Sequence, residues 1–282
     1  MEALAQDLRG RLRDHAIVRV DIAAFSALKT FDPPLSALSG LLVEDVTRHG
    51  KFLDFDASGL HLIVHLARAG WIRWRDTVPG QPPKPSNKSP LAARVVLHDE
   101  SGLDITEAGT KKSLAIYVVR DPQDVPGIAR LGPDPLAEAF TIDVFRQILT
   151  DAGRAQIKGV LRHQGTIAGI GNAYSDELLH AAKMSPFKPA SGITDHELQV
   201  LYDAIRTVLG EAVDRSRGLA ASELKGEKKS HLAVHGRKGL PCPVCGDTVR
   251  EVSFADSSLQ YCATCQTGGK PLADRRLSKL LK

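Results

Sequence analysis

The sequence predicts an α+β protein in which a strand-rich first part is followed by a helical part and a small cysteine-containing segment. Three observations predict this. Short strand-like segments separated by glycines dominate up to residue 119, helical periodicity dominates after residue 135, and all four cysteines lie near the C-terminus. At 282 residues, 43% of them hydrophobic, the chain is long enough for two domains with separate cores.

The first part is predicted to begin with an amphipathic helix and to continue as strands. Leu4, Leu8 and Leu12 recur at helical spacing within Glu2–His15. The strand-like segments that follow are Ile17–Ile22, Leu41–Val46, Phe52–Phe55, Leu60–Leu66, Arg94–Leu97 and Leu114–Val119. The stretch Pro79–Pro90 holds five prolines and is predicted to be a surface loop.

The composition changes between Pro126 and Pro135, and the part that follows is predicted to be helical. Its helical segments are Ala137–Asp151, Gln156–His163, Ala173–Lys183 and Asp195–Ser216. Thr194 and Glu197 match a capping box at the start of the last helix. These patterns predict domains at residues 1–125, 126–235 and 236–282.

The cysteines form two Cys-x-x-Cys pairs, Cys242 with Cys245 and Cys262 with Cys265, separated by sixteen residues. This spacing is typical of a zinc ribbon, in which a β-hairpin closes four thiolates around one tetrahedral Zn²⁺. Gly246 can supply the positive φ of such a turn. Two disulfides in a secreted protein are the alternative. The sequence shows no signal segment and no membrane span, which favours a reducing cytoplasm and zinc.

The positive charge of the chain is concentrated around this ribbon. From residue 226 to residue 282 there are ten Lys and Arg residues against five acids, a local charge of +5, so the rest of the chain sums to −1. The basic residues are Lys228, Lys229, Arg237, Lys238, Arg250, Lys270, Arg275, Arg276, Lys279 and Lys282. This predicts a phosphate-binding surface, with a solvated basic face as the alternative.

A glycine-rich turn precedes one of the predicted helices. Gly165, Gly169 and Gly171 fall within seven residues, directly before Asn172. The backbone N–H groups of such a turn can approach a phosphate, and a helix N-terminus adds a positive dipole there. A turn that allows close helix packing is the alternative.

Taken in order, several motifs resemble the formamidopyrimidine-DNA glycosylase and endonuclease VIII family of base-excision repair enzymes. The motifs span residues 49–51, 65–70, 131–136, 157–158, 168–177 and 234–239, and end with the ribbon at Gln266. The resemblance covers nearly the whole chain. It implies an N-terminal β-sandwich with flanking helices, a helix-two-turn-helix module and a C-terminal zinc ribbon.

The resemblance also implies a function. It predicts a DNA glycosylase with abasic-site lyase activity, a monomer that acts on double-stranded DNA carrying a damaged base or an abasic site. The expected location is the bacterial cytoplasm, at the nucleoid when the protein is on DNA. Such enzymes flip the target base out and hold the kinked backbone with cations. The choice of lesion is expected to depend on the base pocket and on a mobile segment around Leu219–His231.

Individual residues receive roles through this resemblance. Asn172 would hydrogen-bond the DNA backbone beside the lesion, assisted by Lys158 and the turn at Gly171. Lys51 would contact a phosphate and is the candidate proton donor, while Arg237 would clamp a phosphate at the entrance to the ribbon. The alternatives are a helix-capping role for Asn172 and an ordinary solvent-facing lysine at position 51.

The N-terminus departs from the family pattern. Family members normally begin Met-Pro-Glu-Leu-Pro-Glu-Val-Glu, where the proline amine attacks sugar C1′ to form a Schiff base and the next glutamate handles protons. This chain begins Met1-Glu2-Ala3-Leu4, and Glu2 matches the family's later glutamate. A start site assigned too late would produce this sequence. Without the proline, the alternative function is a non-catalytic protein that binds damaged DNA.

Three further departures concern lesion recognition and product. Arg68 replaces the usual methionine of a void-filling loop and is expected to act as a wedge or stacking plane, while Trp71 and Trp74 nearby could equally be core aromatics. The turn at residues 106–112 stands where the family has Arg-Arg-Phe-Gly. Ser257 replaces the ribbon arginine that assists the second elimination, so β-elimination products are expected to dominate.

Overall fold

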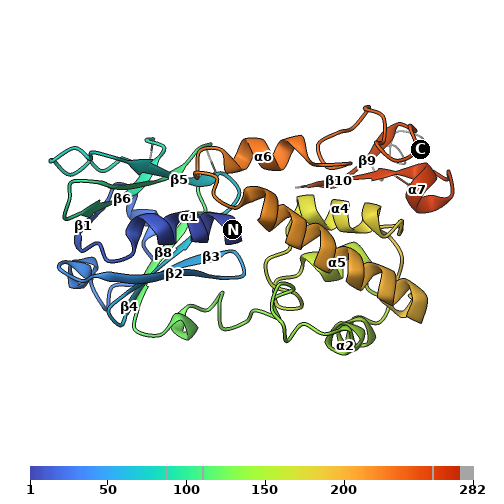
Figure 1. Cartoon of the computed structure of the whole chain (residues 1–282), viewed down its shortest axis with the longest axis horizontal. Helices are drawn as coiled ribbons and strands as arrows, with labels where there is room; N and C mark the ends of the chain where they lie inside the picture. The colour runs from blue at the N-terminus through green and yellow to red at the C-terminus, as the bar shows by residue number, and fades with distance from the viewer. Residues whose placement is uncertain (87, 110, 256, 274–282) are drawn as a thin grey trace. The chain divides into compact units, whose positions relative to one another are not determined.

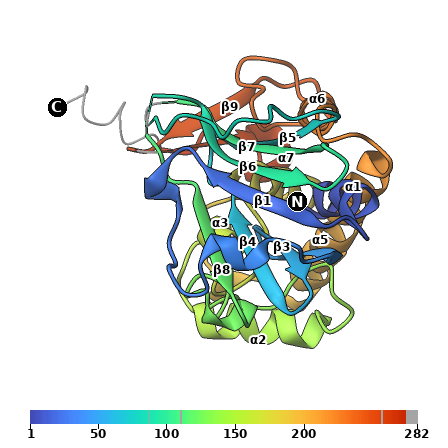
Figure 2. The same ribbon diagram turned by 90° about the vertical axis from the view of Figure 1, so that its left-hand side faces the viewer.

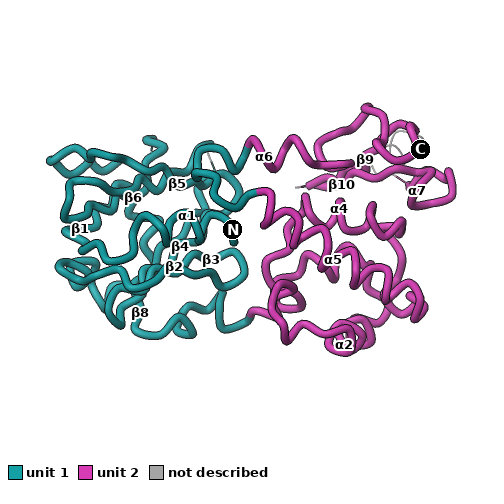
Figure 3. The backbone as a smooth tube through the Cα atoms, viewed as in Figure 1, with its two compact units in different colours: residues 1–130, 216–225 teal, residues 131–215, 226–282 magenta. Residues whose placement is uncertain are grey.

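The computed structural model describes residues 1–86, 88–109, 111–255 and 257–273 (Figure 1). The chain forms two compact units, shown in different colours in Figure 3. Unit 1 comprises residues 1–130 and 216–225, and unit 2 comprises residues 131–215 and 226–282. The basic tail predicted from the sequence, which carries Arg275, Arg276, Lys279 and Lys282, lies outside the described residues.

The described part of unit 1 contains helix α1 and two four-stranded antiparallel sheets. Helix α1 spans Glu2–Leu12. One sheet has the order β1 (Ile17–Ile22), β6 (Leu91–Leu97), β7 (Gly102–Glu107), β5 (Gly70–Arg75). The other has the order β2 (Val43–His49), β3 (Phe52–Ala57), β4 (Leu60–His65), β8 (Ala115–Val119). Figure 2 shows α1 between the two sheets at one side of the unit.

The core of unit 1 explains why these segments fold as they do. Leu4, Leu8 and Leu12 are at most 2% exposed, which confirms the apolar face predicted for α1. Along the strands, alternate residues point into the same core. Leu53 of β3 and Leu62 of β4 are examples. Both sheets and the helix contribute to this one cluster, so unit 1 is the predicted β-sandwich.

Strands β5 and β7 were not predicted from the sequence. Charged residues interrupt their apolar pattern, and the structure shows why they are tolerated. Asp104 of β7 accepts hydrogen bonds from Arg94 of β6 at 2.6 Å and from Arg75 of β5 at 2.9 Å. The charges pair across neighbouring strands, which a single-strand pattern cannot reveal.

Unit 2 contains the helical part and the ribbon. Its helices are α2 (Ile142–Ala152), α3 (Ile157–Arg162), α4 (Asn172–Ala181) and α5 (Asp195–Ser216), and α6 (Leu224–Ser230) leads into the ribbon. The ribbon consists of β9 (Val249–Ser253), β10 (Ser258–Cys262) and α7 (Ala263–Thr267). The capping box is confirmed, because Thr194 N–H donates to Glu197 Oε2 at 2.9 Å and Glu197 N–H donates to Thr194 Oγ1 at 3.3 Å.

Residues 216–225 belong to unit 1 although the predicted boundaries place them in the helical domain. Ala221 and Leu224 are buried in the core of unit 1. Ala221 also donates its N–H to Asp7 Oδ2 at 3.0 Å. In the described part of the chain, no helix has both the length and the apolar character needed to span a membrane.

Candidate metal centre and nucleic-acid interface

The hairpin of β9 and β10 brings the four cysteines together. All four sulfur atoms lie within 4.8 Å of one another, with Cys242 Sγ 3.9 Å from Cys265 Sγ and Cys245 Sγ 3.4 Å from Cys262 Sγ. Four sulfurs bound tetrahedrally to zinc at 2.3 Å would lie about 3.8 Å apart. Gly246 has a φ of +78°, as predicted for this turn. The site fits one structural Zn²⁺, and four protein ligands leave no position for a substrate.

Groups around the cysteines support this site and were not predicted. His180 Nε2 lies 3.2 Å from Cys242 Sγ. Gln266 accepts the Cys262 N–H at 2.9 Å and donates to the Met184 carbonyl at 3.0 Å, which ties the ribbon to the helical part of unit 2. Burial raises the pKa of the Cys262 thiol to about 11, so a bound metal ion would have to displace its proton.

The glycine-rich turn places Asn172 at the start of α4. Gly171 occupies the N-cap position, so Asn172 is the first helical residue and not the cap. Gly169 has a φ of +84°, a conformation that favours glycine. Asn172 Nδ2 donates to the Ser258 carbonyl at 2.8 Å, whereas its buried Oδ1 has no partner.

Arg237 lies on the segment that enters the ribbon. Its Nη2 donates to the Pro241 carbonyl at 3.2 Å, and its Nε is buried without a hydrogen-bond partner. Among the described residues, Asn172 Oδ1 and Arg237 Nε are the two buried side-chain polar atoms without a partner. Such atoms are rare in folded proteins because an unmet hydrogen bond is costly. Both residues were predicted from the sequence as DNA contacts.

Lys158, the third predicted contact in unit 2, lies in α3 and is 5% exposed. Its ammonium group donates to Asp176 Oδ1 at 2.5 Å and to Ser175 Oγ at 2.7 Å, and the Asn172 carbonyl lies 3.4 Å away. Burial lowers the pKa of Lys158, and the Asp176 carboxylate opposes that shift. The ammonium group is therefore engaged inside unit 2.

Lys51 lies in unit 1, in the turn between β2 and β3. Burial lowers the pKa of His65 on β4, and the nearby positive charge of Lys51 lowers it further. The His65 ring packs on Phe52, with ring centroids 4.6 Å apart. Lys51 and His65 are therefore neighbours in unit 1, although they belong to two separate motifs in the sequence.

Comparisons with known proteins agree with this arrangement. Three domain families match the chain: the formamidopyrimidine-DNA glycosylase N-terminal domain at residues 1–115, the formamidopyrimidine-DNA glycosylase H2TH domain at 131–223, and the zinc finger found in FPG and IleRS at 239–268. The formamidopyrimidine-DNA glycosylase of Thermus thermophilus is 34% identical over 243 residues, covering 82% of this chain and 84% of that protein. This chain belongs to the formamidopyrimidine-DNA glycosylase family.

Other members of the family match as well. A formamidopyrimidine-DNA glycosylase-like protein of Mycobacterium tuberculosis is 60% identical over 152 residues, which cover 54% of this chain and 94% of that protein. The crystal structure of the MutM (Fpg) protein of Thermus thermophilus has a TM-score of 0.79 at 30% identity, covering 95% of this chain and 97% of that one. Lactococcus lactis Fpg, in a complex with DNA containing an abasic site, shares the fold with a TM-score of 0.81 at 23% identity, with 94% and 97% coverage.

In this member of the glycosylase family, Arg68 is exposed in the turn between β4 and β5. The two nearby tryptophans are engaged within unit 1. Trp71 Nε1 donates to the Ala221 carbonyl at 3.1 Å, and Trp74 Nε1 donates to Asp76 at 2.9 Å. Arg68 is therefore better placed than either indole to meet a ligand.

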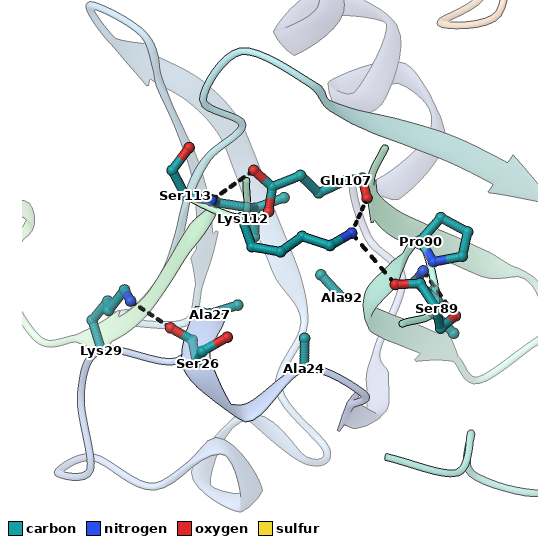
Figure 4. Close-up of a pocket in the computed structure, with 12 residues that line it drawn as sticks. Ala24, Ser26, Ala27, Lys29, Ser89, Pro90, Ala92, Glu107, Lys112 and Ser113 are labelled. Carbon is teal, nitrogen blue, oxygen red and sulfur yellow. Dashed lines mark hydrogen bonds between the residues drawn. The ribbon is translucent and has the colours of Figure 1, made fainter. Parts of the chain in front are cut away.

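The turn that replaces the Arg-Arg-Phe-Gly motif of the family borders a small cavity of about 120 Å³ (Figure 4). Lys112 extends along its wall and donates to the backbone carbonyls of Glu107 and Ser89. The Glu107 carboxylate accepts two backbone N–H groups, the nearer being that of Ser113 at 2.8 Å. The hydrogen bonds of Lys112 and Glu107 to the backbone therefore stabilise the turn. Thr110, at its centre, lies outside the described residues.

The segment around Leu219–His231, which was expected to be mobile, contains both a helix and buried residues. Residues 224–230 form helix α6, and Ala221 and Leu224 are buried. Lys225 Nζ lies 4.4 Å from the centre of the Trp71 ring, a cation–π contact. Its first part, residues 219–225, packs against the core of unit 1, and its mobility stays a prediction.

Two acidic residues of α4 have structural roles that were not predicted from the sequence. The Glu177 carboxylate accepts the backbone N–H groups of residues 233–235 at 2.7 to 3.0 Å. Asp176 lies beside Lys158 and accepts from the Gln260 N–H at 3.3 Å. Both residues are buried, and acidic residues are seldom buried without such partners, which no local sequence pattern identifies.

Proposed function

We propose that this protein is a base-excision repair DNA glycosylase whose abasic-site lyase activity belongs to a form that carries the family's N-terminal proline. Its substrate is double-stranded DNA with a damaged base or an abasic site, in the bacterial cytoplasm. The observation that carries the proposal is the unpartnered buried Nε of Arg237, in a member of this family. Arg237 Nε is a donor, and DNA phosphates supply acceptors.

The proposed DNA contacts use different chemistry at each position. Lys51 supplies a cation for a backbone contact from one turn of unit 1, and Arg68 supplies the wedge from another. In unit 2, Gly171 lets the backbone approach a phosphate at the N-terminus of α4, where the helix dipole is positive. The Asn172 amide can donate twice, and the Ser258 carbonyl takes one of these donors.

The lyase step requires an amine at sugar C1′. In this family the amine is that of an N-terminal proline, whereas position 2 here is Glu2. The Glu2 carboxylate accepts Arg48 Nε at 2.7 Å and Gln6 Nε2 at 3.0 Å, so it stabilises the start of α1. We propose that Lys51 serves as proton donor and that a proline amine placed ahead of Glu2 is the nucleophile.

Borohydride trapping on abasic-site DNA tests this chemistry. The 282-residue chain should bind the DNA but give little trapped adduct. A form extended by Met-Pro-Glu-Leu-Pro-Glu, with the methionine removed, should form the adduct and cleave the strand. With Ser257 in the ribbon, β-elimination products should exceed β,δ-elimination products. Efficient trapping by the 282-residue form, or no activity of the extended form on a broad lesion panel, would contradict the proposal.

Salt-dependent binding tests the contacts. Arg237→Ala should weaken binding to abasic-site DNA and reduce the slope of log K against log salt by about 0.9, the value for one lost phosphate contact. Arg120→Ala is the matched control, because Arg120 is exposed and pairs with Asp32 at the surface of unit 1. An unchanged affinity and slope for Arg237→Ala would show that Arg237 does not contact DNA.

A further inference from the structure

Asp176 is the centre of a buried polar group in unit 2. Its side chain is 1% exposed, and both of its oxygens are used. Oδ1 faces the ammonium group of Lys158 at 2.5 Å. Oδ2 lies 2.7 Å from His235 Nδ1 and accepts the Gln260 N–H at 3.3 Å. One carboxylate therefore joins α3, the segment that enters the ribbon, and β10.

The partners of Lys158 use the whole donor capacity of its ammonium group. Such a group has three N–H donors. Three acceptors surround it: Asp176 Oδ1, Ser175 Oγ and, at 3.4 Å, the Asn172 carbonyl. A phosphate could bind this nitrogen only by displacing one of these acceptors, and loss of the Asp176 contact would leave a buried charge without a counter-ion.

The other side of Asp176 leads to Arg237. His235 lies two residues before Arg237, and the backbone N–H groups of residues 233–235 are held by Glu177. Adjacent carboxylates of α4 thus hold this short segment, one through its backbone and the other through the His235 ring. Arg237, whose Nε is unpartnered, lies two residues after this segment.

We propose that Asp176 is a positioning residue for DNA binding, which orients the Arg237 segment through His235, and that Lys158 is its internal counter-ion and not a phosphate contact. The proposal rests on the proposed function, in which Arg237 binds a phosphate. It assigns Lys158 a role different from the one that the family resemblance implies.

A pair of charge-changing variants of the 282-residue protein tests the proposal. Lys158→Met leaves the Asp176 charge buried and unpaired, so affinity for abasic-site DNA should fall by an order of magnitude or more. Adding Asp176→Asn removes both charges and keeps an amide that can hydrogen-bond His235 and the Gln260 N–H. This double variant should recover affinity to within about threefold of the parent, with the parent's salt slope.

A direct contact between Lys158 and a phosphate predicts a different result. If Lys158 contacts a phosphate, the single and double variants will bind equally weakly, and both salt slopes will fall by about 0.9. That outcome overturns the proposal. Zinc content should remain at the parent's level in both variants, because neither residue touches a cysteine, and this checks that the ribbon is folded.

Two further measurements separate this inference from the proposed function. Without DNA, backbone amides of residues 233–235 should exchange faster in Lys158→Met and return to the parent's rate in the double variant. In an Arg237→Ala background, Lys158→Met should add little further loss of affinity, because both changes act on one contact. If Arg237→Ala alone does not change the affinity for DNA, the proposed contact between Arg237 and a phosphate is wrong. Additive losses, or unchanged exchange in Lys158→Met, overturn the positioning role.

Discussion

Buried charges in both units are held by partners from other elements. Asp104 in unit 1 is a clear case, since it lies between Arg94 and Arg75. Burial alone would raise the pKa of Asp104, but the hydrogen bonds and charges of the two arginines outweigh burial and hold it below the usual value. The interaction stabilises the fold only while the carboxyl group is ionised.

The pH dependence of stability follows from this direction. Because the folded-state pKa of Asp104 is lowered, its contribution is fully present above the unfolded-state pKa of about 3.9 and is lost as the pH falls through the lower folded-state value. Asp104→Asn should cost about 3 kcal/mol at neutral pH, since it leaves Arg94 buried without its counter-ion. Urea unfolding between pH 2 and pH 7 would measure it. A variant whose deficit does not shrink in acid would contradict this account.

At the scale of single elements, the start of α5 shows how local sequence sets a boundary. Thr194→Ala removes the side-chain acceptor of the capping box and should lower the free energy of unfolding by about 1 kcal/mol. Thr150→Ala in α2 is the control, because Thr150 is exposed and bonds only the carbonyl of Arg146 in its own helix. Equal losses in thermal or urea unfolding would rule out a specific capping effect.

The ribbon is an element that depends on its metal. Cys262→Ser removes one of four sulfur ligands and should release zinc, because a structural site needs all of its ligands. DNA binding should weaken at the same time, since the basic ribbon surface requires a folded hairpin. Elemental analysis of the parent should give one zinc per chain. Well under one zinc, or full DNA affinity after loss of the metal, would contradict this prediction.

At the scale of the whole molecule, the chain returns to unit 1 after completing most of the helical part. Leu224→Ala should therefore destabilise unit 1 by about 2 to 4 kcal/mol, because Leu224 is only 8% exposed within its core. Zinc content should not change. Leu240→Ala, at a site 49% exposed in the ribbon, is the control and should have little effect. A Leu224→Ala protein with parental unfolding would show that the segment is not part of that core.

The spacing of residues within short segments was enough to predict the features that those segments encode. The zinc ligands, the capping box of α5, strand Ile17–Ile22 and helix Asp195–Ser216 could all be predicted, because each depends on residues close in sequence. The family could also be predicted, since several short motifs occur in its order. Asn172 and Arg237 were named from the same motifs, and the structure adds that each has a buried polar atom without a partner.

Only the tertiary structure decided the features that depend on distant partners. Strands β5 and β7 carry charges that are paired across the sheet, and residues 216–225 fold with strands more than a hundred positions earlier. The role of Lys158 belongs to the same class, because its sequence motif is the same whether its ammonium group faces a phosphate or Asp176. A buried charge loses its bound water and must be stabilised by protein groups in its place. In this protein, folding brings those groups together from separate parts of the chain.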